Sequence, residues 1–193
     1  MSLLFGPPGS RLQGRPLLGH CSMLGVWGSR TRNSSVFTGR NLDWNANTGI
    51  NKFKLVTVYN FNHSAHSHAT IGYAGLAGAL TGLSTKGVSV HEANLEEEEI
   101  TFRGFPWLLR LRYIMENAAT VAEAVALWNA TNNTAGFNHG IGAPADGFVV
   151  LETRAHYSAV FKDDDPREMG NASSSFIVGH PMKDALWRTN HGY

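Results

Sequence analysis

The chain has little of what most directly assigns a protein to a class. Among its 193 residues there is one cysteine, which excludes an internal disulfide and leaves the redox compartment unassigned. Charged residues make up 16%, and the formal net charge is +1 with the histidines neutral, so charge gives no reason to expect nucleic acid or an anionic membrane as partner. No apolar run approaches the roughly 20 residues of a transmembrane helix.

What is present is the composition of a globular protein. Hydrophobic residues make up 42% of the 193 residues, a length that predicts a single domain. The first twenty residues contain Pro7, Pro8 and Pro16 among several glycines, which predicts an irregular leader rather than a helix or strand. They make a poor secretory signal, because no basic region precedes their short apolar stretch.

The stretch Gly19–Trp44 contains the one cysteine, Cys21, and predicts a β-hairpin, since two runs of strand formers flank turn-forming residues 28–35. The start of one hairpin strand lies beside the end of its partner. The thiol of Cys21, the guanidinium of Arg40 and the carboxylate of Asp43 should therefore meet at one end of a sheet. We expect Arg40 and Asp43 to form an ion pair, because buried charges need partners. On composition alone, the pattern is also that of a structural cysteine beside such a pair.

These residues also carry a family resemblance. Cys21, a strand, a turn and then residues 39–44 (GRNLDW) resemble the N-terminal nucleophile (Ntn) hydrolases, most of all their acyl-coenzyme A:6-aminopenicillanic acid acyltransferase-like branch, which is related to choloylglycine hydrolases. In that family the mature chain begins at the cysteine. The resemblance implies that cleavage of the bond after His20 releases Cys21 as an N-terminal nucleophile. The better-known members cut a Gly–Cys bond, so His20 departs from the family pattern.

Further segments extend the resemblance over most of the chain. Residues 82–88 (GLSTKGV) are similar to the family's G-x-N-x-x-G-[LV] segment, with Ser84 where asparagine is frequent. Asn94 ends the following strand, where the choloylglycine branch places an oxyanion-hole asparagine. Thr189 and Asn190 follow a short strand, where the family places its second essential asparagine. By itself, Asn94 also fits an ordinary strand-end cap. The Thr189-Asn190 dipeptide, taken alone, is too short to identify a site.

The patterning predicts an α+β fold. Three-four apolar spacing predicts a helix within Phe105–Asn117, and Thr120 with Glu123 predicts the capped start of a second helix. Period-two patterning predicts strands at Lys54–Asn60, Val88–Asn94, Gly147–Glu152, Ala155–Phe161 and Phe176–Gly179.

The resemblance implies the Ntn αββα four-layer sandwich, in which two antiparallel sheets lie between helices. Family members continue well past the second asparagine. We therefore expect residues 1–20 to be a propeptide remnant and residues 21–193 to form an Ntn domain that is incomplete at its C-terminus.

The resemblance also implies a role for each candidate residue. Cys21 would form a thioester with the acyl group of a small amide or thioester, using its own α-amine, which titrates at about 8, as general base. Arg40 would lower the thiol pKa and orient substrate, and Asp43 would hold the new ammonium group and Arg40. Asn94 and Asn190 would donate hydrogen bonds to the oxyanion. Water as acceptor gives an amidase and an amine gives an acyltransferase, neither of which needs a cofactor or metal.

Two other hypotheses remain open. One is a catalytically inactive Ntn-fold protein with a binding or structural role. The other is a Cys–His hydrolase of another fold, with His20 or His91 as base. Separately, three histidines have a spacing at which they could bind zinc, namely His63, His66 and His68. No carboxylate or cysteine stands near it, so we interpret this stretch as a solvated hairpin tip.

Two expectations concern the surface. Five Asn-x-Ser/Thr sequons suggest a glycosylated protein that is secreted or lysosomal, although some of them can be accidental. They begin at Asn33, Asn62, Asn129, Asn132 and Asn171. An incomplete sandwich would also expose apolar sheet surface, from which we expect self-association.

Overall fold

The computed structural model describes residues 21–44, 46–62, 65–95, 99–169 and 181–192. The leader at residues 1–20 and the strand predicted at 176–179 lie outside this part of the chain. The strands are β1 (Cys21–Gly28), β2 (Ser34–Leu42), β3 (Lys54–Tyr59), β4 (His68–Tyr73), β5 (Thr81–Ser84), β6 (Ser89–Asn94), β7 (Phe137–Ala143), β8 (Gly147–Arg154), β9 (Tyr157–Phe161) and β10 (Ala185–Arg188), and the α-helices are α1 (Trp107–Asn117) and α2 (Val121–Asn129).

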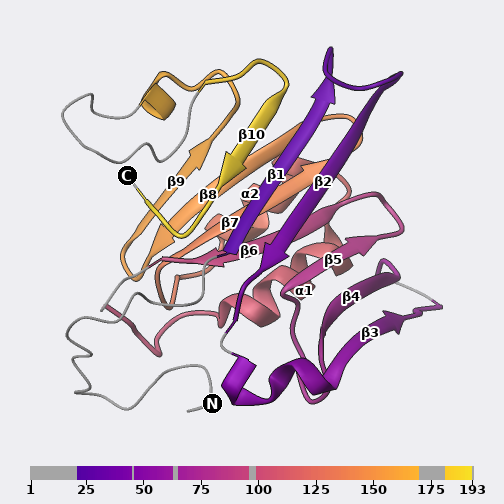
Figure 1. The fold of residues 1–193 in the computed structure, drawn as a ribbon, viewed down its shortest axis with the longest axis vertical. Coiled ribbons are helices and arrows are strands. Elements are labelled where there is room, and N and C mark those ends of the chain that lie inside the picture. The colour runs from indigo at the N-terminus through magenta and orange to yellow at the C-terminus, as the bar shows by residue number, and fades with distance from the viewer. Residues whose placement is uncertain (1–20, 45, 63–64, 96–98, 170–180, 193) are drawn as a thin grey trace.

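The strands form two sheets in which all neighbours are antiparallel. The smaller sheet has the order β10-β1-β2, and the larger has the order β3-β4-β5-β6-β7-β8-β9. Figure 1 shows the smaller sheet in front of the larger one, with α1 and α2 behind both. The smaller sheet contacts β6, β7 and β8, and the helices contact β5 to β8 from the opposite face. This confirms the α+β class with antiparallel sheets; within the described residues both α-helices belong to one layer.

The hairpin predicted around Cys21 is formed by β1 and β2. Cys21 pairs with Leu42, and Met23 pairs with Arg40. Gly25 is required where β1 crosses the larger sheet, because a Cβ at this position would collide with the Phe148 ring on β8. This close approach brings the inward side chains of β1 into the core between the sheets.

Two apolar cores hold the layers together. The first fills the space between the helices and the larger sheet, where Leu111, Ile114 and Met115 of α1 are 0% exposed. The second lies between the sheets and consists of Cys21, Met23, Ala93, Phe148, Val150 and Leu186. The candidate nucleophile is therefore part of the sheet–sheet core.

Both predicted helices are present, and the cap of α2 follows from its sequence. The Thr120 hydroxyl accepts a hydrogen bond from the Glu123 backbone N–H at 3.1 Å, and the Glu123 carboxylate accepts one from Ala119 at 2.7 Å. These bonds satisfy donors that a helix N-terminus otherwise leaves unpaired.

The structure corrects the interpretation of the histidine cluster at His68, whereas His63 lies outside the described residues. His68 is not at a solvated tip: it begins β4, is 3% exposed, and stacks on Tyr59 with ring centroids 4.7 Å apart. The reason is its pairing with Tyr59 across β3 and β4, which fixes its ring against that neighbour. Within the described residues, no helix is long and apolar enough to cross a bilayer.

Candidate active site

Cys21 occupies the first position of the central strand of the smaller sheet. Alternation along β1 turns Cys21 and Met23 toward the core and Leu24 outward, so the thiol-bearing residue is 3% exposed and Leu24 is 48% exposed. The strand start thus presents a thiol at the inner face of the sandwich.

Arg40 reaches this thiol from the neighbouring strand. Its Nη2 lies 3.5 Å from Cys21 Sγ. Its Nε donates to the backbone oxygen of Glu92 at 2.6 Å, and Nη2 forms an ion pair with the Glu92 carboxylate. The side chains of Arg40 and Glu92 are only 5% and 6% exposed, so each charge is buried with the other as its partner.

The predicted ion pair between Arg40 and Asp43 is wrong. β2 ends at Leu42, and Asp43 lies beyond it at the surface, where its carboxylate accepts a hydrogen bond from Asn41 Nδ2 at 3.0 Å. Asp43 still acts on the site, because its backbone lowers the pKa of the Cys21 thiol. The strand end therefore contributes a backbone group where the sequence suggested a carboxylate.

The two candidate asparagines meet beside the backbone of Cys21. Asn190 follows β10, is 6% exposed, and accepts a hydrogen bond from the Cys21 backbone N–H through Oδ1. Its Nδ2 donates to the backbone oxygen of Asn94 at 2.6 Å and to Asn94 Oδ1 at 2.7 Å. The fold thus brings together four candidate residues from distant parts of the chain, namely Cys21, Arg40, Asn94 and Asn190.

Burial dominates the electrostatics of the thiol. It raises the pKa of Cys21, and the Glu92 carboxylate raises this pKa further, whereas Arg40 and the Asp43 backbone lower it. Burial also raises the pKa of Glu92, against the opposing effect of Arg40. The expected lowering by Arg40 is present, but the net pKa shift of Cys21 is upward, which favours the neutral thiol.

A protein-family model matches the part of the chain that contains most of these candidate residues. The model of the family described as acyl-coenzyme A:6-aminopenicillanic acid acyl-transferase matches residues 29–192. The chain belongs to this acyltransferase family. The matched region of the acyltransferase-family chain includes Arg40, Asp43, Asn94 and Asn190 and begins after Cys21.

Solved structures show the same fold. An N-acylethanolamine-hydrolyzing acid amidase ortholog from Caenorhabditis elegans superposes with a TM-score of 0.61 at 20% identity, over 73% of this chain and 63% of that chain. Penicillin V acylase from Agrobacterium tumefaciens superposes with a TM-score of 0.53 at 14% identity, over 73% of this chain and 49% of that chain. The acyltransferase-family chain thus spans between about half and two thirds of these neighbours, and both confirm the Ntn fold. No curated protein matches it.

The fold and His91 both argue against a Cys–His hydrolase of another fold. His91 is 4% exposed, and its ring lies 6.2 Å from that of Phe148. Burial, followed by the charge of Arg40, lowers the pKa of His91 to about 4. Neither ring nitrogen has a hydrogen-bond partner among the described residues, so His91 forms no Cys–His pair there. The same part of the chain contains no cluster of three or more potential metal ligands.

Sequence reasoning missed Glu92. A signal was available, because Glu92 shares a strand face with the apolar residues Val88 and Val90, and a buried carboxylate needs a cation. Period-two alternation in the strand predicted at Val88–Asn94 places Glu92 and Asn94 on one face, but it does not show that β2 brings Arg40 to that strand.

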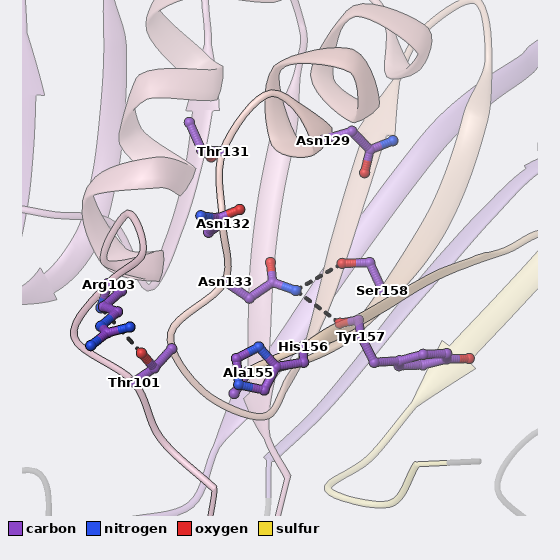
Figure 2. Close-up of a pocket in the computed structure, with 10 residues that line it drawn as sticks. All are labelled: Thr101, Arg103, Asn129, Thr131, Asn132, Asn133, Ala155, His156, Tyr157 and Ser158. Carbon is purple, nitrogen blue, oxygen red and sulfur yellow. Dashed lines mark hydrogen bonds between the residues drawn. The ribbon is translucent and has the colours of Figure 1, made fainter.

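A separate polar pocket lies away from these residues. It has a volume of about 430 Å³ and is lined by the loop at 101–103, the segment after α2 and the turn between β8 and β9. Figure 2 shows how Asn133 forms its wall, since Asn133 Nδ2 donates to the Tyr157 backbone oxygen and to Ser158 Oγ, each at 2.8 Å. None of the candidate catalytic residues lines this pocket.

Proposed function

We propose that this protein is a cysteine Ntn hydrolase or acyltransferase that carries its acyl group as a thioester on Cys21. The proposal rests on one observation, which is that two side chains far apart in the sequence converge on Cys21. The Arg40 guanidinium lies 3.5 Å from the Cys21 sulfur, and the Asn190 carboxamide bonds to the Cys21 backbone nitrogen. Membership of the acyltransferase family supports acyl transfer as the reaction class.

Activation would proceed by self-cleavage before Cys21. The sulfur attacks the carbonyl carbon of His20, the peptide C–N bond breaks as the acyl group moves to sulfur, and water then hydrolyses the thioester. The products are a carboxylate on His20 and a free α-amine on Cys21. In this step the thiol proton passes to the departing nitrogen of Cys21. Because burial raises the pKa of the thiol, later turnover needs a general base, and the α-amine that cleavage releases, titrating at about 8, supplies one.

Turnover would repeat this chemistry on a substrate. The Cys21 sulfur attacks the acyl carbonyl, its proton passes to the α-amine, and collapse of the tetrahedral intermediate expels an amine or thiol that takes up the proton. Water or an acceptor amine then cleaves the new C–S bond and restores the thiol. A small acyl amide is the favoured substrate class, since one neighbour is named an acid amidase and another a penicillin acylase.

The other residues would stabilise charge around the sulfur. Asn94 and Asn190 would donate to the oxyanion, a contribution of about 3 kcal/mol per donor in comparable sites. Arg40, held by Glu92, would orient the substrate and favour thiolate. Asp43, which follows β2, would stabilise the new ammonium group.

A labelled acyl probe tests the proposal. Wild-type protein incubated with an activated acyl ester should gain one acyl mass, and peptide mapping should place it on Cys21. The Cys21→Ala variant should gain none at equal concentration. If wild type gains no acyl group, or gains it equally without Cys21, the thioester proposal fails and a binding role for the fold becomes the better account.

A further inference from the structure

Asn190 lies just beyond the regular pairing of its strand. The register between β10 and β1 ends where Arg188 faces Met23, and Asn190 is two residues further on. A side chain that must meet both Cys21 and Asn94 therefore stands on backbone that the sheet ladder does not hold. Besides the hydrogen bonds of the Asn190 side chain itself, a contact to the backbone on either side of it helps to fix its direction.

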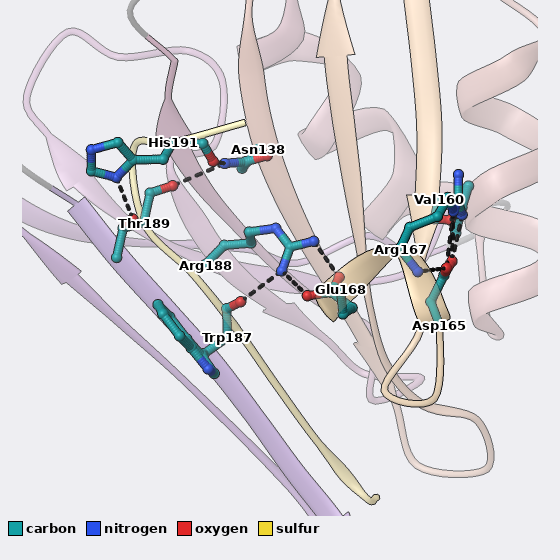
Figure 3. A network of polar contacts seen from close by, with 9 residues as sticks. All are labelled: Asn138, Val160, Asp165, Arg167, Glu168, Trp187, Arg188, Thr189 and His191. Carbon is teal, nitrogen blue, oxygen red and sulfur yellow. Dashed lines mark hydrogen bonds and ion pairs between the residues drawn. The ribbon is translucent and has the colours of Figure 1, made fainter. Parts of the chain in front are cut away.

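The contact that fixes this backbone comes from Asn138 of β7, on the larger sheet. Asn138 is 0% exposed, and its Nδ2 donates to the backbone oxygens of Thr189 and His191, both at 2.9 Å. Figure 3 shows these carbonyl groups turned toward the Asn138 amide. One amide nitrogen thus binds the residues on both sides of Asn190.

We infer that Asn138 is a positioning residue that aims the Asn190 carboxamide at the reacting centre. The inference rests on the proposed function, in which Asn190 stabilises the oxyanion. Asn138 touches neither the sulfur nor the substrate in this account. It acts by fixing the backbone from which Asn190 projects.

The location of Asn138 suits this role because it links both candidate oxyanion donors. In the β6–β7 ladder Asn138 pairs with Ala93, the residue before Asn94. Asn138 therefore helps to position Asn94 through the backbone pairing of β6 with β7, and it helps to position Asn190 through its own side chain. The relative placement of the two amides follows from one residue on a rigid central strand.

A second anchor supports the segment from its other side. The Arg188 guanidinium binds the Glu168 carboxylate, with Nη1 to Oε2 at 2.7 Å, and both side chains are 0% exposed. Thr189 Oγ1 lies 2.9 Å from His191 Nδ1, as Figure 3 also shows. The ion pair anchors the start of the segment and the second contact joins the residues that flank Asn190, whereas Asn138 binds the carbonyls next to Asn190 itself.

The chemistry of the side chain defines a sharp substitution. An asparagine amide supplies two N–H groups for two carbonyl oxygens. Asn138→Asp keeps the shape but removes both donors and places oxygen against two acceptors. Asn138→Ser keeps one donor and no charge, which makes it the milder variant if the aspartate variant folds poorly.

Asn133 provides the matched control. It is also a buried asparagine, and its Nδ2 donates to the backbone oxygens of Arg154 and Tyr157 at 2.9 and 2.8 Å. It lies in the wall of the polar pocket of Figure 2, which no candidate catalytic residue lines. Asn133→Asp therefore makes the same amide-to-carboxylate change away from the proposed chemistry, at a side chain whose Oδ1 also accepts from Arg110 Nη1 at 2.8 Å.

The test combines backbone hydrogen exchange with the rate of Cys21 acylation by the activated ester. Asn138→Asp should speed exchange in residues 186–192 and slow acylation about 100-fold, the size of losing one oxyanion donor. Asn138→Ser should show the same pair of effects at smaller size. Asn133→Asp should leave both the exchange of residues 186–192 and the acylation rate at wild-type values.

A double variant separates positioning from general support. Asn138→Asp should slow acylation no further in an Asn190→Ala background, because the residue it aims is then absent. Independent, multiplying losses would overturn the inference, and so would wild-type exchange and acylation in both Asn138 variants. Failure of wild type to acylate would instead overturn the proposed function, and the exchange comparison would then decide alone whether Asn138 fixes this segment.

Discussion

At the scale of single residues, the buried pair of Arg40 and Glu92 decides how the site is charged. Glu92 neutralises a guanidinium that is 5% exposed and holds it against the Cys21 sulfur. The same carboxylate raises the thiol pKa. Arg40 and Glu92 therefore have opposite effects on one thiol, and removing either changes both stability and reactivity.

The free energy of unfolding should show whether Glu92 or Asp43 is the carboxylate that pairs with Arg40. Glu92→Gln leaves a buried guanidinium without its anion and should lower the free energy of unfolding by about 3–5 kcal/mol. Asp43→Asn changes an exposed side chain and should lie within about 0.5 kcal/mol of wild type. Urea unfolding of both variants measures this, and equal losses would contradict the pairing seen in the structure.

Thiol reactivity should follow the upward pKa shift of Cys21. The native chain binds the thiol proton more tightly than the unfolded chain does, so the stability from this group is fully present below the ordinary cysteine pKa. It is lost as pH rises from that value through the higher pKa of the native thiol. Alkylation by iodoacetamide should reach its midpoint above that range in the unprocessed protein. Glu92→Gln should move the midpoint to lower pH, and a shift to higher pH would contradict the assigned cause.

At the scale of elements, local patterns predicted the β1–β2 hairpin, both helices and the strands β8 and β9, because each depends on residues near in sequence. The placement of Asn190 beside Cys21 came from the family resemblance, since 169 residues separate them. Hydrophobic periodicity could not predict that β10 pairs with β1 or that Arg40 contacts Glu92, because tertiary packing determines which strands become neighbours. The predicted Arg40–Asp43 pair failed for the same reason.

The last residue of α2, Asn129, and the segment after this helix carry two of the predicted glycosylation sequons. Asn129 and Asn132 are both exposed, and Asn132 binds the Arg110 guanidinium through its backbone oxygen, which leaves the side chain outside. Expression in a secretory host should give a product whose mass falls on endoglycosidase treatment. Asn129→Gln and Asn132→Gln should each remove part of that shift, whereas a wild-type product without any shift would contradict the prediction.

At the scale of the whole molecule, the smaller sheet covers only part of the larger one. It contacts β6, β7 and β8, and Figure 1 shows β3 and β4 extending beyond β2. Register places Val56 opposite Ile71, and Val58 in line with Ala69 and Leu83. The four large apolar residues of this face are between 55% and 71% exposed, namely Val56, Val58, Ile71 and Leu83.

This face should make the isolated chain self-associate. Sedimentation velocity should show species larger than the monomer, and Val58→Lys with Ile71→Lys should shift them toward monomer. Phe102→Lys, at an 82% exposed loop position, is the control for added charge alone. A wild-type chain that sediments as a monomer over the accessible concentration range would contradict the prediction.

The central claim is that Cys21 is an N-terminal nucleophile, and intact mass tests it most directly. Wild type should yield a fragment that begins at Cys21 and that gains one acyl mass from the activated ester. Cys21→Ala should stay uncut and unacylated, and Cys21→Ser should be cut slowly, because a hydroxyl is the weaker nucleophile at neutral pH. Equal cutting of wild type and Cys21→Ala, or acylation of uncut wild type, would contradict the account.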